Sequence, residues 1–575
     1  MLPLIFFNHY TFALKQKETM DKNFILCGSA LALLTGCAAE TKEVQKPNIM
    51  LIVLDDMGYS DLGVFGSEIR TPNIDKLARQ GVQYTRFHTS SLSAPSRAML
   101  MTGVDNHQNG LGAMPPMASA NQYMQDGYEG ALNDRVATIG ELLQNSGYYT
   151  FTIGKWHLGH HKGQLPNDRG FNHSLSLMAG GTSHFDNHYA MCSYDEPVTY
   201  YCEDGERVEK LPEDFYSTRS YTDKVIDYIA SSPADKPIMG YLAFTAPHDP
   251  LHIIDEWSDR YDGIYDGGYD EIKRARHDRQ IEFGLIPTST PYHSTSTLWD
   301  SLSDQEKKEQ SRKMEIYAAM LEYTDYSIGR IIETLKASGR YENTLFVVMS
   351  DNGSNPKEPH FYPGNSVEQI AAEYNNSFEN YGKKDSFISL GKSWAEVCST
   401  PLRDYKMVMS EGGINTPLII SGVGVTEPKI DKSSLIHITD IMPTLLDVAG
   451  AKYSIKGKEL IPLYGRVIGK EPRTEDDVLC FEMMEDKAVI KGDWKAYQRS
   501  KSNGGDGETW FLYNLKEDIT ESCNQADKHP EVVALLVEEW NRYAKRVGHI
   551  EFSGTMLNQT LSAEEYYQYN IKNRK

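Results

Sequence analysis

Apolar residues gather in four runs of strand length, and each run is followed by charged or polar residues. The runs cover residues 47–54, 148–153, 237–245 and 344–349. Continuous apolar runs of this length are typical of strands that are buried on both faces of an α/β sheet. Two further strands are expected at 82–89 and 418–421.

Helices are predicted between these strands. One begins near Thr71, with Asn73 as its cap, and a second covers 138–146. Apolar residues at 328–335 follow the spacing of a helix that packs on a core, and 438–448 forms another helix. Strand, helix and strand recur at a spacing that indicates right-handed crossovers. We therefore expect an α/β fold with a large, mainly parallel sheet flanked by helices.

The pattern changes beyond about residue 453. Short strand-like segments separated by Gly, Asp and Asn turns precede a helix at 530–547. This order predicts a small α+β domain with an antiparallel sheet. The chain is therefore divided into a large domain, 48–453, and a C-terminal subdomain, 454–575.

The first 47 residues resemble a targeting segment rather than a folded one. After Met20, a charged Lys22 precedes an apolar run at 24–34 that is too short to span a bilayer and suits a signal peptide. The ending Leu34-Thr35-Gly36-Cys37 resembles a bacterial lipobox, which implies a lipid on Cys37. We predict an upstream extension and lipoprotein signal at 1–37, a tether at 38–47, and export to the periplasm or cell surface. A plain secretory peptide and a buried N-terminal helix are the alternatives.

Charge excludes one class of partner. The chain has 575 residues, more than one ordinary domain, with 80 acidic and 58 basic side chains and a formal net charge of −22. This balance argues against a protein that binds nucleic acid. A small anionic substrate would need a local cluster of Lys, Arg or metal.

Five of the seven cysteines lie outside the signal segment. They are odd in number and lack metal-ligand spacing, so they suggest no zinc site. Cys192 and Cys202 flank a segment that is compatible with a disulfide-clipped hairpin and also with two free buried thiols.

Polar side chains follow the first and last of the four apolar runs, where open α/β sheets bind their ligands. Asp55 and Asp56 end the first run, and Asp351 and Asn352 end the last. Adjacent carboxylates repel each other, and a hard cation relieves that repulsion. Solvated loop acids are the alternative, but the position at a strand end favours a metal site.

The stretch SLSAPSRAMLMTG, residues 91–103, places Ser93 at a helix entrance, with Arg97 on the same face one turn later. A helix N-terminus suits a bound anion, although a capped surface helix has the same spacing. The stretch resembles the signature of the type I sulfatases, Cys/Ser-x-Pro-Ser-Arg followed by Thr-Gly. The resemblance implies that Ser93 is oxidised to formylglycine, the nucleophile of that family.

Further segments resemble the same family, namely GKWHLG at 154–159, APHDP at 246–250, DNG at 351–353 and a lysine before EGG at 411–413. By resemblance, Lys155 contacts the sulfate, His157 assists the formylglycine and His248 protonates the leaving oxygen. The same comparison makes Asp351 the proton acceptor for the nucleophile. The sulfate-positioning cations are Lys155, Lys406, Arg97 and the metal ion.

The resemblance also implies a calcium ion, with magnesium as the alternative, because the predicted ligands are oxygen atoms. The implied ligands are Asp55, Asp56, modified Ser93, Asp351 and Asn352. The family segment after EGG ends in Ile-Arg-x-Pro, whereas this chain has Asn415, to which no role is assigned. The similarity extends over 47–547 and implies an alkaline phosphatase-like fold.

Serine at the position of the nucleophile resembles sulfatases that are matured by a radical-type enzyme. The resemblance implies a sulfate monoester substrate, with exo-action on host glycans such as mucin O-glycans that carry sulfated galactose or N-acetylglucosamine. Aryl sulfates and glycosaminoglycans are alternative substrates. A phosphodiesterase or phosphonate hydrolase of the same superfamily and a non-catalytic glycan binder are alternative functions.

Two loops are expected near the substrate. In the loop 180–189, His184, Asp186 and His188 are candidate substrate contacts, with plain surface residues as the alternative. The polar, tyrosine-rich insertion at 255–308 is expected to form part of the substrate rim.

Overall fold

The computed structural model describes residues 46–114, 116–192, 194, 199–455, 458, 473–474 and 476–573. The predicted signal peptide and lipidated Cys37 lie outside these residues. Among the residues described, no helix is both long and apolar enough to cross a membrane.

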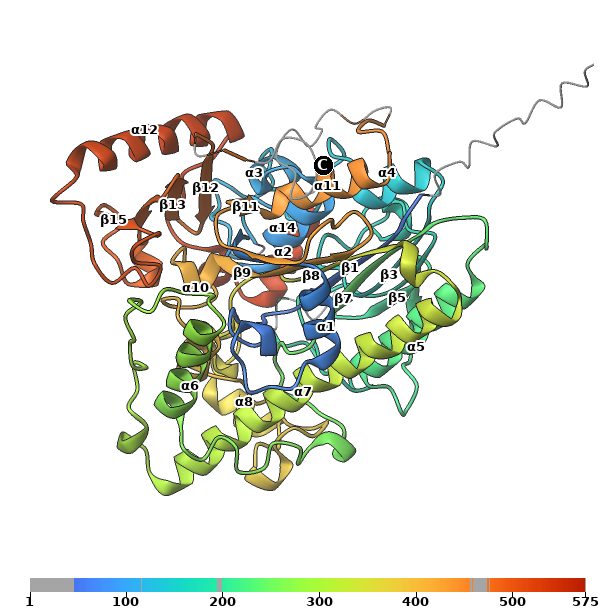
Figure 1. The fold of residues 1–575 in the computed structure, drawn as a ribbon, viewed down its shortest axis with the longest axis horizontal. Helices are drawn as coiled ribbons and strands as arrows, with labels where there is room; N and C mark the ends of the chain where they lie inside the picture. Colours follow the sequence, from blue (N-terminus) through green and yellow to red (C-terminus); the bar gives the residue numbers. More distant parts are fainter. Residues whose placement is uncertain are drawn as a thin grey trace, which may run out of the picture. The chain divides into compact units, whose positions relative to one another are not determined.

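The centre of the molecule is a large, mainly parallel sheet that contains eleven of the described strands (Figure 1). Across the sheet the order is β10 (Lys429–Asp431), β2 (Val82–His88), β9 (Asn415–Gly422), β8 (Thr344–Ser350), β1 (Asn48–Leu54), β7 (Ile238–Phe244), β3 (Tyr149–Lys155), β4 (His173–Leu177), β5 (Tyr201–Glu203) and β6 (Glu206–Val208), with β11 (Ile436–His437) beside β2. Strand β1 pairs in parallel with β7 on one side and with β8 on the other. Strand β9 runs antiparallel to both of its neighbours, β8 and β2.

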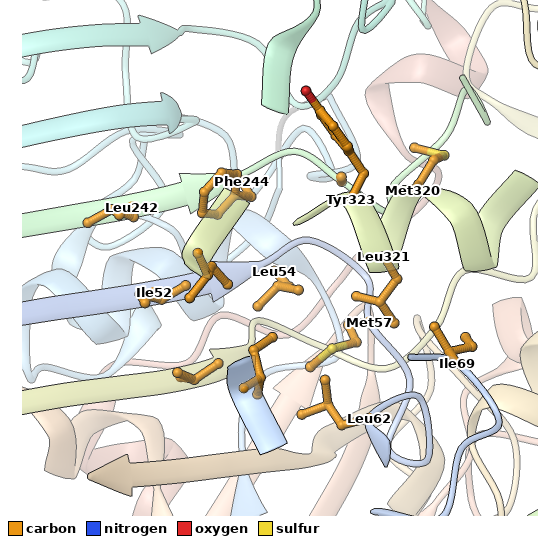
Figure 2. Close-up of a cluster of buried hydrophobic side chains, with 14 of the residues drawn as sticks. Ile52, Leu54, Met57, Leu62, Ile69, Leu242, Phe244, Met320, Leu321 and Tyr323 are labelled. Carbon is orange, nitrogen blue, oxygen red and sulfur yellow. The ribbon is translucent and has the colours of Figure 1, made fainter. Parts of the chain in front are cut away.

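The centre of the sheet is buried on both faces because β1, β7 and β8 are apolar at nearly every position. In β1, Ile52 and Leu54 belong to one core and Leu51 and Val53 to the other. The first core also contains residues of the long helix α7 (Asp304–Ala337), as Figure 2 shows for Leu321. The predicted α/β fold is therefore confirmed.

Helices cover both faces of this sheet (Figure 1). The covering helices on one face are α1 (Pro72–Gln80), α5 (Ser217–Ser231) and α7, and on the other α2 (Ser93–Thr102), α4 (Ile139–Asn145) and α11 (Ile441–Val448). The N-cap of α1 is Thr71, not Asn73 as predicted, since the Asn73 side chain instead donates a hydrogen bond to Asp325 at 2.9 Å.

A second, four-stranded antiparallel sheet follows in the C-terminal part, as predicted. Its strands are β12 (Val478–Met483), β13 (Asp486–Lys491), β14 (Trp494–Gln498) and β15 (Trp510–Asn514). Helix α12 (Pro530–Val547) packs Leu536 and Trp540 onto one face. The other face packs on Leu92 and Ile414 of the larger part of the chain, which fixes this sheet close to Ser93.

Candidate active site

Three carboxylates and one amide meet at the ends of two neighbouring parallel strands. Asp55 and Asp56 follow β1 and Asp351 and Asn352 follow β8, and the register pairs Leu54 with Ser350. All four residues are at most 1% exposed. Asp56 has a φ of 64°, so the chain turns back there, and its carboxylate accepts a hydrogen bond from Asn352 Nδ2 at 2.6 Å.

Ser93 is the first residue of α2 and lies against this group. Its hydroxyl Oγ is 3.2 Å from Asp55 Oδ1 and 3.1 Å from Asn352 Oδ1. The N-cap residue, Leu92, has no polar side chain with which to cap the helix, and Pro95 has no N–H. The first N–H groups of α2 therefore remain available to an anion near Ser93.

Arg97 lies beneath Ser93 rather than beside the substrate space. Its guanidinium Nη2 is 2.8 Å from Asp351 Oδ2 and 3.3 Å from Asp55 Oδ1, and the side chain is fully buried. Arg97 is absent from the lining of the pocket over Ser93, among the residues that the structure describes. Both carboxylates hold the guanidinium below the pocket floor, so Arg97, which was expected among the sulfate-positioning cations, does not itself line the pocket.

Two lysines cover the carboxylates from the pocket side. Lys155 Nζ lies 2.7 Å from Asp55 Oδ2, and Lys406 Nζ lies 2.7 Å from both carboxylate oxygens of Asp56. Burial raises the pKa of Asp55, but the charges of Lys155 and Arg97 outweigh it and hold this pKa at about 2. The carboxylates are therefore ionised, and the ammonium groups are held at fixed positions.

Two histidines line the same pocket. His248 Nδ1 donates to the carbonyl of Asp249 at 2.8 Å, which directs Nε2 toward Asp56 Oδ2 at 3.2 Å and Lys406 Nζ at 3.5 Å. His157 Nδ1 is buried and has no hydrogen-bond partner among the described residues. Burial, followed by the charges of Lys155 and Arg97, lowers the pKa of His157 well below its ordinary value, so this ring is neutral.

The pocket above Ser93 has an empty volume of about 720 Å³, including the space at its mouth. Of the predicted site residues, Ser93, Lys155, His157, His248 and Lys406 line it, and the Asp and Asn side chains lie below. Part of its wall is apolar, formed by Leu92, Met114, Pro116, Met117, Met191, Pro363 and Met407.

The sequence reasoning missed a polar part of the wall. Asn355 Nδ2 donates to Asp249 Oδ2 and to the Tyr362 hydroxyl, both at 2.7 Å. Beside them, Lys357 has no carboxylate within ion-pair distance in the described part of the chain, and burial followed by the charge of Lys406 lowers its pKa to about 8. These residues follow DNG in a loop with no motif or periodicity that would have identified them.

The loop residues offered as substrate contacts do not reach the pocket. His184 is buried, and its Nε2 donates to the carbonyl of His248 at 3.0 Å. Asp186 forms an ion pair with Lys384 at 2.6 Å, and His188 Nδ1 bonds the carbonyl of Asp186 at 3.1 Å. His184 therefore supports the backbone of His248.

The insertion at 255–308 also lies elsewhere. None of its residues, all of which the structure describes, lines the pocket. Its helix α6 (Tyr269–Glu282) is held by Arg276, which forms ion pairs with Asp61 at 2.6 Å and Glu68 at 2.7 Å. The predicted rim is wrong in this respect, because these pairs fix the insertion to the segment that follows β1.

Cys192 and Cys202 are both buried, and no disulfide joins them. Cys202 is in β5 and pairs with Ser176 of β4, whereas Cys192 lines the pocket. Of the two alternatives, the structure has two buried thiols and not the disulfide-clipped hairpin.

Comparisons with known proteins agree on one family. The sulfatase family model matches residues 47–451. The arylsulfatase of Klebsiella aerogenes is 41% identical over 443 residues, which cover 76% of this chain and 94% of that protein. The solved structure of Ps i-CgsB with k-i-k-neocarrahexaose has a TM-score of 0.62 at 24% identity and covers 92% of this chain and 98% of its own. A solved complex with the substrate D-glucosamine-2-N,6-O-disulfate has a TM-score of 0.54 at 20% identity and covers 88% and 98%.

Proposed function

The chain belongs to the sulfatase family and is a sulfuric ester hydrolase, and we propose that it removes sulfate monoesters from sugars with Ser93, matured to formylglycine, as the nucleophile. The position of Ser93 is the observation that carries this proposal. Its Oγ lies on the pocket floor, within 3.2 Å of Asp55 and Asn352, at the first turn of a buried helix.

The buried oxygen atoms below Ser93 fit a divalent cation. Asp55, Asp56 and Asp351 bring three negative charges into a site with at most 1% exposure, and Asn352 adds a neutral amide oxygen. Hard oxygen donors without cysteine suit calcium, with magnesium as the alternative. The ion would be held by these four residues and modified Ser93, and when bound it would withdraw charge from a sulfate oxygen.

The charges around the pocket suit a sulfate ester. Lys155, Lys406 and Arg97 offset the charges of the three carboxylates, so a bound divalent cation would leave the site positive toward a sulfate ester, which is a monoanion. The ammonium groups of Lys155 and Lys406 reach the pocket and would hold the sulfate oxygens. The hydrated aldehyde of formylglycine supplies one hydroxyl for attack on sulfur and a second for release of sulfate.

The two histidines take opposite proton-transfer roles. His248 presents Nε2 to the pocket, with Nδ1 fixed by the Asp249 carbonyl, and would protonate the departing sugar oxygen. His157 is neutral and its Nδ1 lacks a partner among the described residues, so this ring would accept the proton of the second hydroxyl. Asp351 would accept the proton of the attacking hydroxyl.

The pocket wall favours a sugar ring. Met114, Met117 and Met407 offer a flexible apolar surface for one face of the ring, and Lys357 offers hydrogen bonds to its hydroxyl or acidic groups. A pocket of this size, open at its mouth, suits the terminal residue of a glycan, such as the sulfated galactose or N-acetylglucosamine of a mucin O-glycan.

The experiment compares protein made with and without a radical-type sulfatase-maturing enzyme. We expect the peptide that contains Ser93 to lose two hydrogen atoms only after maturation, and only that protein to release sulfate from a panel of defined sulfated saccharides. Hydrolysis rates on two further compounds test the alternatives. Nitrophenyl sulfate distinguishes an arylsulfatase from the proposed enzyme, and nitrophenyl phosphate distinguishes a phosphoesterase. Full activity with unmodified Ser93 would exclude the formylglycine mechanism.

We also propose that the protein is an exported lipoprotein anchored through Cys37. The proposal rests on the signal-like run at 24–34 and the lipobox-like ending. Labelled palmitate should be incorporated into the wild-type protein in a bacterial host and not into Cys37→Ala. Equal labelling of both proteins would contradict it.

A further inference from the structure

A second cluster of metal-ligating side chains lies away from the pocket. It joins His107, which follows α2 at the start of the short helix α3 (Asn106–Asn109), to Glu482 of β12 and His549, which follows α12. One ligand atom of each residue lies within 4.8 Å of the other two. None of the three lines the active-site pocket.

The ring of His107 is held in the orientation of a metal ligand. Its Nδ1 is 3.0 Å from Asp105 Oδ1, and the Tyr543 hydroxyl donates to the other oxygen of Asp105 at 2.8 Å. Nε2 therefore points to Glu482 Oε2, which is 2.7 Å away. A carboxylate that orients the far nitrogen of a histidine is the usual support of a metal-bound ring.

His549 supplies an independent observation. Its side chain is 8% exposed, and its Nε2 has no hydrogen-bond partner among the described residues. This nitrogen faces Glu482 Oε2 at 3.8 Å and Glu485 Oε1 at 3.6 Å, which is too far for a hydrogen bond to either. A buried nitrogen without a partner is costly, and a cation between these groups removes the cost.

The chemistry of the donors indicates the class of ion. Two imidazoles with one or two carboxylates match zinc, whereas the oxygen donors below Ser93 match calcium. Ligand atoms at 2.0–2.2 Å from a tetrahedral zinc ion lie about 3.4 Å apart. The separations of 2.7 and 3.8 Å from Glu482 Oε2 to the two rings bracket this value, so small side-chain shifts are sufficient.

We propose that His107, Glu482 and His549 bind one zinc ion, with Glu485 or water completing the coordination. Binding displaces the proton shared between His107 Nε2 and Glu482 Oε2, and this proton passes to solvent. The ion would link three segments, namely the chain after α2, the β12–β13 hairpin and the end of α12. The spacing in the sequence gives no sign of this site, since 375 residues separate His107 from Glu482 and 67 separate Glu482 from His549.

Metal analysis of the whole protein tests the proposal. After removal of metal with a chelator and dialysis against limiting zinc, the wild-type protein should retain about one zinc per chain. Zinc at 100 times its dissociation constant should raise the Tm by about 3 °C. His549→Ala should lose both effects, whereas His529→Ala, a partly exposed histidine at the start of α12, should keep them.

Asp351→Asn separates the two metal sites, because it alters the calcium ligands and should leave zinc binding intact. Anomalous diffraction at the zinc edge, measured on crystals of the wild-type protein, needs no variant. It should place the ion between His107 and His549. The proposal is overturned if the wild-type protein binds no zinc, if His549→Ala binds it equally, or if only Asp351→Asn loses it.

Discussion

Arg97 and Asp351 form a fully buried ion pair, in which Nε and Nη2 of the guanidinium lie 2.9 and 2.8 Å from the same carboxylate oxygen, Oδ2. Nη2 also reaches Asp55 at 3.3 Å. One arginine thus connects the ends of β1 and β8 beneath the nucleophile. Its role is to position the carboxylates of the site.

Removal of this guanidinium should affect folding as well as activity. Arg97→Met leaves Asp55 and Asp351 without a shared cation, which should lower the free energy of unfolding by about 3–5 kcal/mol in the presence of a calcium chelator. Urea denaturation measures the loss, and saturating calcium should reduce it. Arg330→Met removes a partly exposed partner of Asp223 and should change stability by less than about 1 kcal/mol. Equal effects of the two substitutions would contradict the positioning role.

The sequence was informative wherever a signal is local. The apolar run at 47–54 predicted β1, and the polar residues after it predicted that Asp55, Asp56, Asp351 and Asn352 would meet, because parallel strands end at the same edge. The family motifs added Ser93, Lys155, His157, His248 and Lys406, which do surround one pocket.

Non-local features were not predictable. The orientation of β9 depends on which strands it meets, and the direction of the Arg97 side chain depends on two carboxylates that lie 42 and 254 residues away. Lys357 belongs to a loop without a motif. The start of α7 was missed although Ser303 and Glu306 form a capping box, since the polar composition there suggested a loop.

Lys357 provides a test of substrate class. Its ammonium lines the pocket without a carboxylate partner in the described part of the chain, and a charge-assisted hydrogen bond to an acidic group contributes about 1.5–3 kcal/mol. Lys357→Met should therefore lower kcat/KM by about 10- to 100-fold for saccharides that carry a carboxylate or a second sulfate. Lys357→Arg should preserve most of it, and nitrophenyl sulfate should be nearly unaffected. Equal losses on all substrates would mean that Lys357 contacts the reacting sulfate instead.

A buried histidine makes stability depend on pH. His252 Nε2 donates to the carbonyl of Ser386 at 2.8 Å, and Nδ1 accepts from the backbone N–H of His184 at 3.3 Å. Both nitrogen atoms of the neutral ring are therefore hydrogen-bonded. Burial, followed by the charge of His184, lowers its pKa to about 3. Since the unfolded pKa is about 6.5, the neutral ring stabilises the fold above that pH, and the stabilisation is lost as the pH falls toward 3.

Between pH 6.5 and 4.5 this group alone should reduce the free energy of unfolding by about 2.3 kcal/mol. Urea midpoints at the two pH values measure the loss. His252→Gln can make similar hydrogen bonds without gaining a charge. The free energy of unfolding of this variant should therefore decrease less than that of the wild type between the two pH values, and the difference should equal that amount. The surface substitution His529→Gln should retain the wild-type dependence, and a His252→Gln protein with the same dependence would exclude this explanation.

Lys495 joins the small sheet to the active-site scaffold. Its Nζ, on β14, lies 2.8 Å from Glu411 Oε1 and 2.9 Å from Glu521 Oε1, and all three side chains are at most 1% exposed. Asn415 donates to the other oxygen of Glu411 at 3.0 Å, so the residue that replaces the family's arginine also serves this cluster. Lys495 therefore lies between two buried carboxylates, and His88 Nε2 is also 3.0 Å from Glu411 Oε2.

Lys495→Met should remove the ammonium group that the two buried carboxylates share and lower the free energy of unfolding by about 3–5 kcal/mol at pH 8. Burial raises the pKa of Glu521 to about 7 even with Lys495 present, and loss of the lysine raises it further. A carboxyl group with a raised pKa stabilises the fold below its unfolded pKa of about 4.5, and this contribution is lost as the pH rises through 7. The cost of Lys495→Met should therefore be smaller at pH 5.5 than at pH 8, and Lys495→Met with Glu521→Gln should recover part of it at the higher pH.

Lys491→Met, whose partner Glu539 is on the surface of α12, should cost less than about 1 kcal/mol at both values. A Lys495→Met cost that is the same at both pH values would show that the lost packing of the side chain, and not the unpaired carboxylates, causes the destabilisation.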